Sequence, residues 1–168
     1  MPTATIAEAV AGGVDAVHLR DHAASARELF GRGRELRDLD AWLIVNDRID
    51  VAMALGADGV QLRESSLPLE EARRVAPGMR FGLSIHAPRQ TTADWTILGS
   101  IYPTSSHPGG ATLGPGAITP GVIAIGGITH ANVSEVLAAG AHGIAVITAI
   151  TRAPSPRDAA RRFRELMG

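Results

Sequence analysis

The chain has 168 residues, which is enough for one domain with a full hydrophobic core and too few for two comfortable ones. Its formal net charge of -1 gives no reason to expect a nucleic acid or an anionic membrane as partner. With no cysteine it has no disulfide, thiolate nucleophile or cysteine-bound metal. Neither a signal peptide nor an apolar run of about 20 residues is evident. We therefore expect a single cytoplasmic domain over residues 1–168.

The first half of the chain predicts alternating helices and strands. Ser25, followed three residues later by Glu28, is typical of a helix N-terminus closed by a capping box. Gly56 is placed to end another helix. We expect helices over residues 5–12, 25–39, 49–55 and 68–76, and strands over 16–20, 42–45, 57–62 and 81–86.

The second half continues the alternation. A strand near residue 94 leads into residues 99–110, which begin as an apolar strand and pass into hydroxyls, a histidine, prolines and glycines. Residues 123–129 and 145–149 repeat that plan. A strand over 143–147 and helices over 131–139 and 158–167 complete the chain. Strict alternation predicts an α/β fold with a mainly parallel sheet, either doubly wound or closed into a barrel.

Repeated phrases favour the closed form. Gly-Ala-Asp-Gly-Val begins at Gly56 and Gly-Ala-His-Gly-Ile at Gly140, which suggests equivalent units of a (β/α)8 TIM barrel. Only seven strands are predicted, however, and the first element is a helix. Residues 87–93 and 115–121 are also too short for helical crossovers, which need at least about 10 residues. The barrel is therefore expected to be incomplete: either these connections are unusual, or an initial strand and two helical stretches are absent.

Small and hydroxylated residues follow three of the strands, which predicts a shared polar mouth. The alternative is that these are ordinary turns in which glycine, serine and threonine serve only geometry and capping.

Seven motifs together resemble the thiamine-phosphate synthase and TenI superfamily, in the same order and over nearly the whole chain. The motifs are Val17-His18-Leu19-Arg20-Asp21, Ile44-Val45-Asn46-Asp47-Arg48, Gly56-Ala57-Asp58-Gly59-Val60-Gln61-Leu62, Gly82-Leu83-Ser84-Ile85-His86, Tyr102-Pro103-Thr104-Ser105-Ser106-His107-Pro108-Gly109, Ala124-Ile125-Gly126-Gly127-Ile128-Thr129 and Val146-Ile147-Thr148-Ala149-Ile150. The resemblance implies a (β/α)8 barrel that binds a thiazole phosphate. In the synthase branch, a hydroxymethylpyrimidine diphosphate loses magnesium-bound pyrophosphate and the thiazole nitrogen attacks the resulting cation. In the TenI branch, a thiazole phosphate carboxylate is tautomerised by proton transfer.

The resemblance also implies site residues. The thiazole-phosphate cradle falls on Gly126, Gly127, Ile147 and Thr148. Contacts to the diphosphate and its metal fall on Arg20, Asn46, Asp47, Ser84, Thr104, Ser106 and His107. Asp47 would be the magnesium ligand. Taken on its own, Asp47 is equally plausible as a helix N-cap or as the partner of Arg48.

Departures from the synthase pattern favour the TenI branch. Lysines of that pattern are replaced by His22 and His107, and its acidic magnesium ligand falls within residues 63–66, which read Arg-Glu-Ser-Ser. Histidine adds a proton carrier where a fixed positive charge is lost. The catalytic histidine of the TenI pattern falls at Ser100, so its role would pass to His107 or to His86, His18 or His22.

We therefore expect TenI-like tautomerisation, with His107, His86 and Arg20 as the catalytic groups and no required cofactor. The first alternative is a magnesium-dependent thiamine-phosphate synthase. The second is a non-catalytic barrel that binds a thiazole or thiamine phosphate as a sensor or partner subunit. The expected partners are small phosphorylated thiazoles and pyrimidines, and homo-oligomers are possible because an incomplete barrel exposes strand edges.

Overall fold

The computed structural model describes residues 1–104 and 109–168. Its sheet has seven parallel strands that neighbour one another in chain order. The strands are β1 (Ala16–Leu19), β2 (Trp42–Asn46), β3 (Gly59–Leu62), β4 (Arg80–Ile85), β5 (Trp95–Gly99), β6 (Ile123–Ile125) and β7 (Gly143–Ala145). The helices are α1 (Thr3–Ala11), α2 (Ala26–Leu36), α3 (Ile49–Leu55), α4 (Leu69–Val75), α5 (Val133–Ala138), α6 (Thr148–Thr151) and α7 (Pro156–Met167), with a 3-10 turn η1 (Pro115–Ala117).

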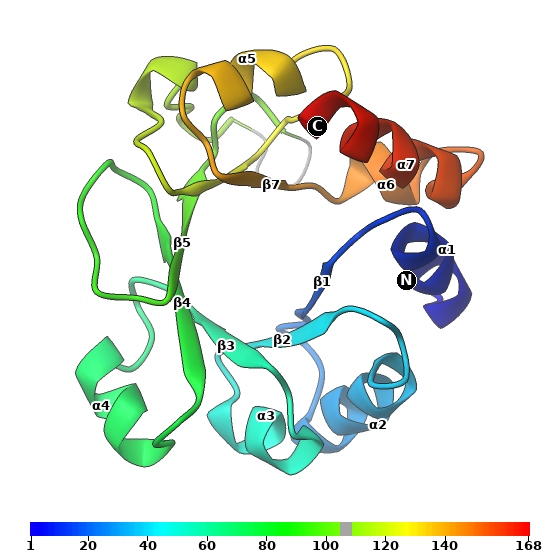
Figure 1. Ribbon diagram of the computed structural model, residues 1–168. Coiled ribbons are helices and arrows are strands. Elements are labelled where there is room, and N and C mark those ends of the chain that lie inside the picture. The colour runs from blue at the N-terminus through cyan, green and yellow to red at the C-terminus, as the bar shows by residue number, and fades with distance from the viewer. Residues whose placement is uncertain (105–108) are drawn as a thin grey trace.

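The sheet curls around a common interior, with the helices outside it (Figure 1). The prediction of an α/β fold with a parallel sheet is confirmed. Among the described residues, β1 and β7 each pair with one neighbour only, so the ring is not closed by backbone hydrogen bonds there. The structure is therefore a curved seven-stranded half-barrel, and the complete eight-stranded barrel is not observed.

The connections after β4 and β5 differ from the others, as their lengths predicted. Residues 86–94 join β4 to β5 without a helix, and the described part of the connection after β5 contains only the short turn η1. Parallel pairing is nonetheless regular on both sides of β5, with Gly82 opposite Trp95 and Ile97 opposite Ile123.

Several helix ends follow directly from local sequence. Ser25 Oγ accepts a hydrogen bond from the Glu28 amide at 3.3 Å, and Glu28 Oε2 accepts one from the Ser25 amide at 2.7 Å, so the predicted capping box is present. Gly56 ends α3 in the left-handed conformation, with φ 59°. Helix α2 ends at Leu36, three residues earlier than expected.

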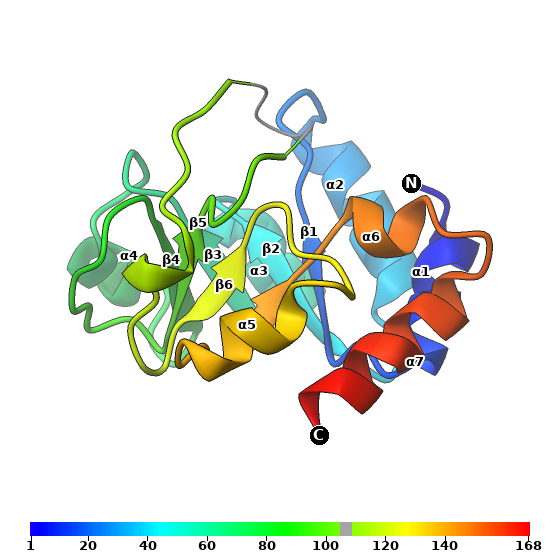
Figure 2. The ribbon, with the colours of Figure 1, turned by 90° about the horizontal axis from the view of Figure 1, so that it is seen from above.

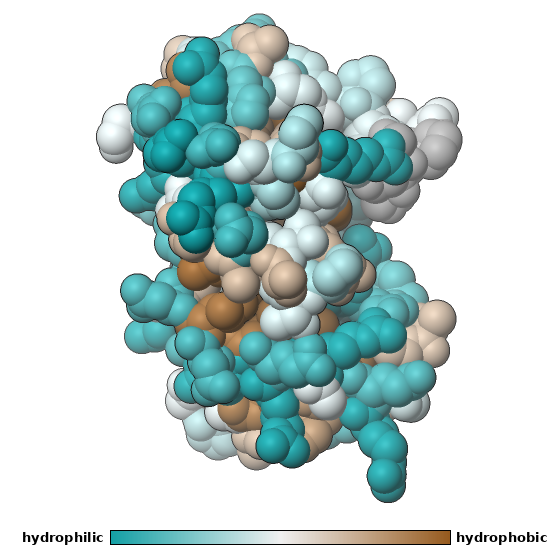
Figure 3. Space-filling model, turned by 90° about the vertical axis from the view of Figure 1, so that its right-hand side faces the viewer, coloured by the Kyte–Doolittle hydropathy of each residue, from teal (hydrophilic) through white to brown (hydrophobic). Residues whose placement is uncertain are grey.

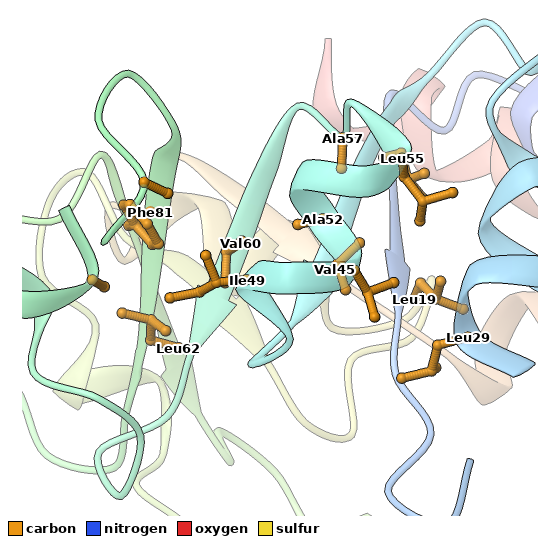
Figure 4. Packing of buried hydrophobic residues seen from close by; sticks show 14 of the residues in the cluster. Leu19, Leu29, Val45, Ile49, Ala52, Leu55, Ala57, Val60, Leu62 and Phe81 are labelled. Carbon is orange, nitrogen blue, oxygen red and sulfur yellow. The ribbon is translucent and has the colours of Figure 1, made fainter. Parts of the chain in front are cut away.

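Two hydrophobic clusters lie between the sheet and its helices. The first joins β1–β4 to α2, α3 and α4, with Val45, Val60 and Phe81 fully buried (Figure 4). The second joins β4–β6 to α5 and α7, and it includes Ala9 of α1. Helices α1 and α7 also pack against each other, so the ends of the described chain meet on one side of the molecule.

The surface on that side is strongly polar. Seen from the right-hand side of Figure 1, most of the surface is hydrophilic, and hydrophobic residues gather mainly in a band across the middle, with smaller patches above and below it (Figure 3). The arginines of α2 and α7 are exposed, as is usual for charged residues on the outer face of a helix. No helix in residues 1–104 or 109–168 is long and apolar enough to cross a membrane.

Candidate active site

Polar side chains follow four neighbouring strands at one edge of the sheet. Arg20 comes directly after β1, Asp47 after β2, Arg63 after β3 and His86 after β4. Because parallel strands end at the same edge, these exits open onto one side of the sheet. The connections after β1 and β5 extend beyond the sheet on the same side (Figure 2).

Asp47 is held in a small network with the exit of β3. Its backbone adopts the left-handed conformation at φ 59°, and its amide donates to the Gln61 carbonyl at 3.0 Å. Its Oδ2 lies 2.5 Å from Nε of Arg63, and its Oδ1 accepts a hydrogen bond from the Ser66 hydroxyl. The Arg63 amide in turn donates to Ser66 Oγ at 2.8 Å.

Two expectations about Asp47 are therefore wrong. Arg48 pairs with Asp50 instead, with Nε 2.9 Å from Oδ1. Arg48 is also the N-cap residue of α3, and no side chain caps that helix. The positive φ of Asp47 turns its side chain toward β3 rather than toward the start of α3.

The donor set around Asp47 does not fit a magnesium ion. Mg²⁺ requires oxygen ligands from one or two carboxylates, together with substrate phosphates and water. Both carboxylate oxygens of Asp47 already have partners, and one of these is the cation Arg63. Among the described residues, no group of three or more histidine, aspartate or glutamate side chains is placed to hold a metal.

A second network links the exits of β3 and β4. Glu64 accepts from His86 Nδ1 at 2.9 Å and pairs with Arg89 at 3.0 Å. The hydrogen bond from His86 lowers the pKa of Glu64, and the positive charge of Arg89 adds to this. His86 is thus a rim residue engaged in an ion-pair network, with its side chain 72% exposed.

The guanidinium of Arg20 is oriented by a neighbour on the same loop. Its Nε donates to Nε2 of His22 at 3.0 Å. A ring nitrogen that accepts a hydrogen bond carries no proton, so His22 orients Arg20 in this arrangement without adding a charge.

The interior face of the sheet holds a polar chain that the sequence did not suggest. Nε1 of Trp95 donates to Oε1 of Gln61 at 2.6 Å, and Nε2 of Gln61 donates to Ser84 Oγ at 2.9 Å. Gln61 is fully buried. A Cβ on Gly82 would lie 2.0 Å from the Trp95 indole nitrogen, so glycine is required there. Glycine inside a strand pattern is a signal of such close approach.

His18 and Asn46 also face this interior. Desolvation, followed by the positive charge of Arg20, lowers the pKa of His18 to about 4, while a hydrogen bond with Asn46 opposes the shift. Water still reaches the ring, because the residue is exposed on the open side of the half-barrel. His18 is therefore a neutral imidazole at pH 7.

The proposed phosphate cradle falls where β6 and β7 end. Ile125 lies opposite Ala145, so Gly126 and Gly127 lie beside the start of the segment that leads into α6. Both glycines have positive φ, and a Cβ on Gly127 would lie 2.4 Å from the Pro103 carbonyl oxygen. Ile147 is the N-cap of α6 and Thr148 is its first residue.

Asn132 fixes this glycine turn. Its Oδ1 accepts from the Thr129 amide at 2.7 Å, and its Nδ2 donates to the Gly127 carbonyl at 3.1 Å. The helix α6 was not foreseen, because four residues are too few for a periodic pattern. Thr104 is half-buried, whereas Ser106 and His107 lie outside the described residues.

Polar groups at the strand exits of a curled parallel sheet define an enzyme of the (β/α) barrel class. Residues 2–150 match the family model described as thiamine monophosphate synthase. The chain is 40% identical to the thiamine-phosphate synthase of Methanospirillum hungatei, over 95% of this chain and 87% of the relative. For that of Natronomonas pharaonis the identity is 41%, over 97% and 86%. The chain belongs to the thiamine monophosphate synthase family and is an enzyme of the synthase and TenI type.

Solved structures agree with this assignment. Thiamine phosphate pyrophosphorylase from Pyrococcus furiosus superposes with a TM-score of 0.88 at 34% identity, over 99% of this chain and 89% of the other. Phosphoribosyl anthranilate isomerase from Thermotoga maritima superposes with a TM-score of 0.73 at 15% identity, over 99% and 94%, and shows the fold alone.

The expectation of TenI-like tautomerisation is wrong. Curated relatives that share 35% to 41% identity with nearly the whole chain are named thiamine-phosphate synthase. The two histidines in place of lysines do not decide the branch: His22 accepts a hydrogen bond from Arg20, and His107 lies outside the described residues.

The alignments also bear on the short connections. Aligning 95% of the 168 residues to the Methanospirillum protein takes 179 positions. The relative therefore has internal residues with no counterpart here, in keeping with connections that lack helices.

Proposed function

We propose that this protein is a thiamine-phosphate synthase, which joins hydroxymethylpyrimidine diphosphate to a thiazole phosphate. The observation that carries the proposal is the identity with named synthases over nearly the whole chain. The anion-binding groups at the strand exits support it. Arg20 and Arg63 offer charged N–H donors to a diphosphate, and the glycine turn after β6 offers main-chain amides to a separate phosphate.

In the proposed reaction, the bond between the pyrimidine methylene carbon and the diphosphate oxygen breaks, and pyrophosphate leaves with the electron pair. The thiazole nitrogen then donates its lone pair to the methylene carbon and forms the new C–N bond. No net proton transfer is needed. The residues of this chain must therefore position two anions and stabilise the charge that develops on the leaving group.

Ser84 is suited to donate a hydrogen bond to that leaving group. The indole N–H of Trp95 can only donate, so the Gln61 atom facing it is the carbonyl oxygen. The amide nitrogen of Gln61 then faces Ser84 Oγ as a donor, and the Ser84 hydroxyl proton remains for another acceptor. His18 and Asn46 are uncharged at pH 7 and suit the polar edge of a neutral pyrimidine ring.

Incubation of the purified protein with both phosphorylated precursors tests the proposal. We expect equal amounts of thiamine phosphate and pyrophosphate, separated by chromatography, and a loss of rate of about 10-fold or more for Ser84→Ala. Binding of either precursor without turnover would contradict the proposal and favour the non-catalytic alternative.

A further inference from the structure

Arg63 stands at the centre of the exit network, where a family with magnesium-bound pyrophosphate would need metal ligands. Its backbone amide is fixed by Ser66 and its Nε by Asp47, and Ser66 also donates to Asp47. One contact thus holds the guanidinium itself, and the other two fix the Arg63 backbone and the Asp47 carboxylate that it pairs with. Both carboxylate oxygens of Asp47 are already bonded to protein groups, Oδ2 to Arg63 and Oδ1 to Ser66.

The hydrogen bonds of this network leave the terminal nitrogens of the guanidinium unused. The ion pair with Asp47 uses Nε, so the two terminal nitrogens of Arg63 are the donors that this pair leaves for an anion. The Arg63 side chain is 45% exposed, whereas that of Asp47 is 20% exposed. An incoming anion therefore meets the guanidinium before the carboxylate.

We propose that the terminal nitrogens of Arg63, held by Asp47 and Ser66, bind the diphosphate in place of a divalent cation. A planar guanidinium matches two phosphate oxygens and keeps its charge at every physiological pH. In this arrangement Asp47 is a positioning residue and not a metal ligand. The inference rests on the proposed function for the identity of the substrate.

The net charge of the Arg63–Asp47 pair differs from that of a metal-bound carboxylate. A divalent cation on one carboxylate carries a net charge of +1, whereas Arg63 with Asp47 is neutral overall. Stabilisation of the leaving group must then come from directed N–H donors and from the charge of Arg20 at the exit of β1, which forms no ion pair among the described residues. A metal that bound Asp47 would first have to displace Arg63 and would then lie beside its positive charge.

The first experiment measures thiamine phosphate formation with excess EDTA and, separately, with Mg²⁺. We expect the two rates to agree within about twofold, because no step needs the metal. Loss of all turnover in EDTA, with recovery on adding Mg²⁺, would overturn the proposal.

The second experiment titrates inorganic pyrophosphate calorimetrically in EDTA, and it is informative even if the protein forms no thiamine phosphate. We expect Arg63→Ala to weaken binding at least about 10-fold, the size of one lost charge-assisted contact. The matched control is Arg48→Ala, which removes another aspartate-paired arginine and should leave the affinity unchanged. Equal losses in both variants, or none in Arg63→Ala, would refute a role for Arg63.

A third comparison separates the two roles of Asp47. Asp47→Asn keeps an oxygen that can accept from Arg63, so a positioning role predicts at most about a threefold change in pyrophosphate affinity in EDTA. If Asp47 were a metal ligand, Mg²⁺ would raise the pyrophosphate affinity of the unaltered protein. Asp47→Asn would then abolish that rise and leave the affinity in EDTA unchanged. Such a gain in the unaltered protein would itself overturn the proposal.

Discussion

Trp95 of β5 and Gln61 of β3 meet across the intervening strand β4, with the indole nitrogen 2.6 Å from the amide oxygen. Gln61 also donates a hydrogen bond to Ser84, so the contact links the Trp95 indole to the Ser84 hydroxyl. An indole on β5 thereby determines which way a hydroxyl on β4 presents its proton.

Trp95→Phe should lower the free energy of unfolding by about 1–3 kcal/mol, since it leaves the buried Gln61 oxygen without a donor. Urea denaturation measures this change. Trp42→Phe is the control, since Trp42 is exposed and its ring is stacked by Arg80 at 4.6 Å. This control should lower the free energy of unfolding by no more than about 0.5–1 kcal/mol. An equal cost for both variants would mean that the interior hydrogen bond contributes nothing.

Gly82→Ala should destabilise the fold by about 1–3 kcal/mol through overpacking. The new Cβ would lie 2.0 Å from Trp95 Nε1 and 2.4 Å from Gln61 Oε1. Gly31→Ala tests the opposite case, because a Cβ there meets nothing within 4 Å. Removing a glycine from the middle of α2 should stabilise the protein by about 0.5–1 kcal/mol. Melting temperatures that move in the same direction would contradict this account.

His18 should make stability depend on pH. Its pKa is about 4 in the folded state and is ordinarily 6.5, so the unfolded chain binds more protons between these values. The free energy of unfolding should therefore fall as pH falls from 6.5 to 4, by an amount reduced by the exposure of the ring. Urea titrations at pH 7 and pH 4.5 should show a smaller loss for His18→Gln than for the unaltered chain. Equal losses would place the proton uptake elsewhere.

Asn132→Ala should loosen the glycine turn after β6. It removes the acceptor for the Thr129 amide and the donor to the Gly127 carbonyl, with an expected cost of about 1 kcal/mol or more. Under the proposed function, the Michaelis constant for the thiazole phosphate should rise more than that for the diphosphate. Asn132→Asp keeps the acceptor and should recover part of the stability. A rise confined to the diphosphate would contradict the assignment of the cradle.

Local features of the sequence were sufficient for most of the fold. The capping box of Ser25 and Glu28 and the end of α3 at Gly56 depend on neighbours within a few residues, so they could be read directly. The absence of helices in the short connections followed from length alone. The strand leading to residues 99–110 was misplaced, because β5 already ends at Gly99. Ile101 follows that strand and is buried in a loop. In the sequence, a buried apolar loop residue cannot be distinguished from a residue of a buried strand.

The site was less accessible to sequence reasoning. The pairing of Asp47 with Arg63 depends on the register of β2 and β3, which places residues 16 positions apart side by side. The neighbours of Asp47 in the chain suggest only an ion pair with Arg48 or a cap at the start of α3. The motif comparison correctly found the family, but the histidine substitutions predicted the wrong branch, as the relatives named thiamine-phosphate synthase show.

The two hydrophobic clusters meet at β4, which is joined to β5 by the helix-free residues 86–94. A single cut within that loop would leave each polypeptide with one cluster of its own. The amino-terminal piece would keep α1, whose Ala9 belongs to the other cluster and whose partner is α7. Two separately produced fragments would therefore be expected to reassemble through two pairs of elements, β4 with β5 and α1 with α7.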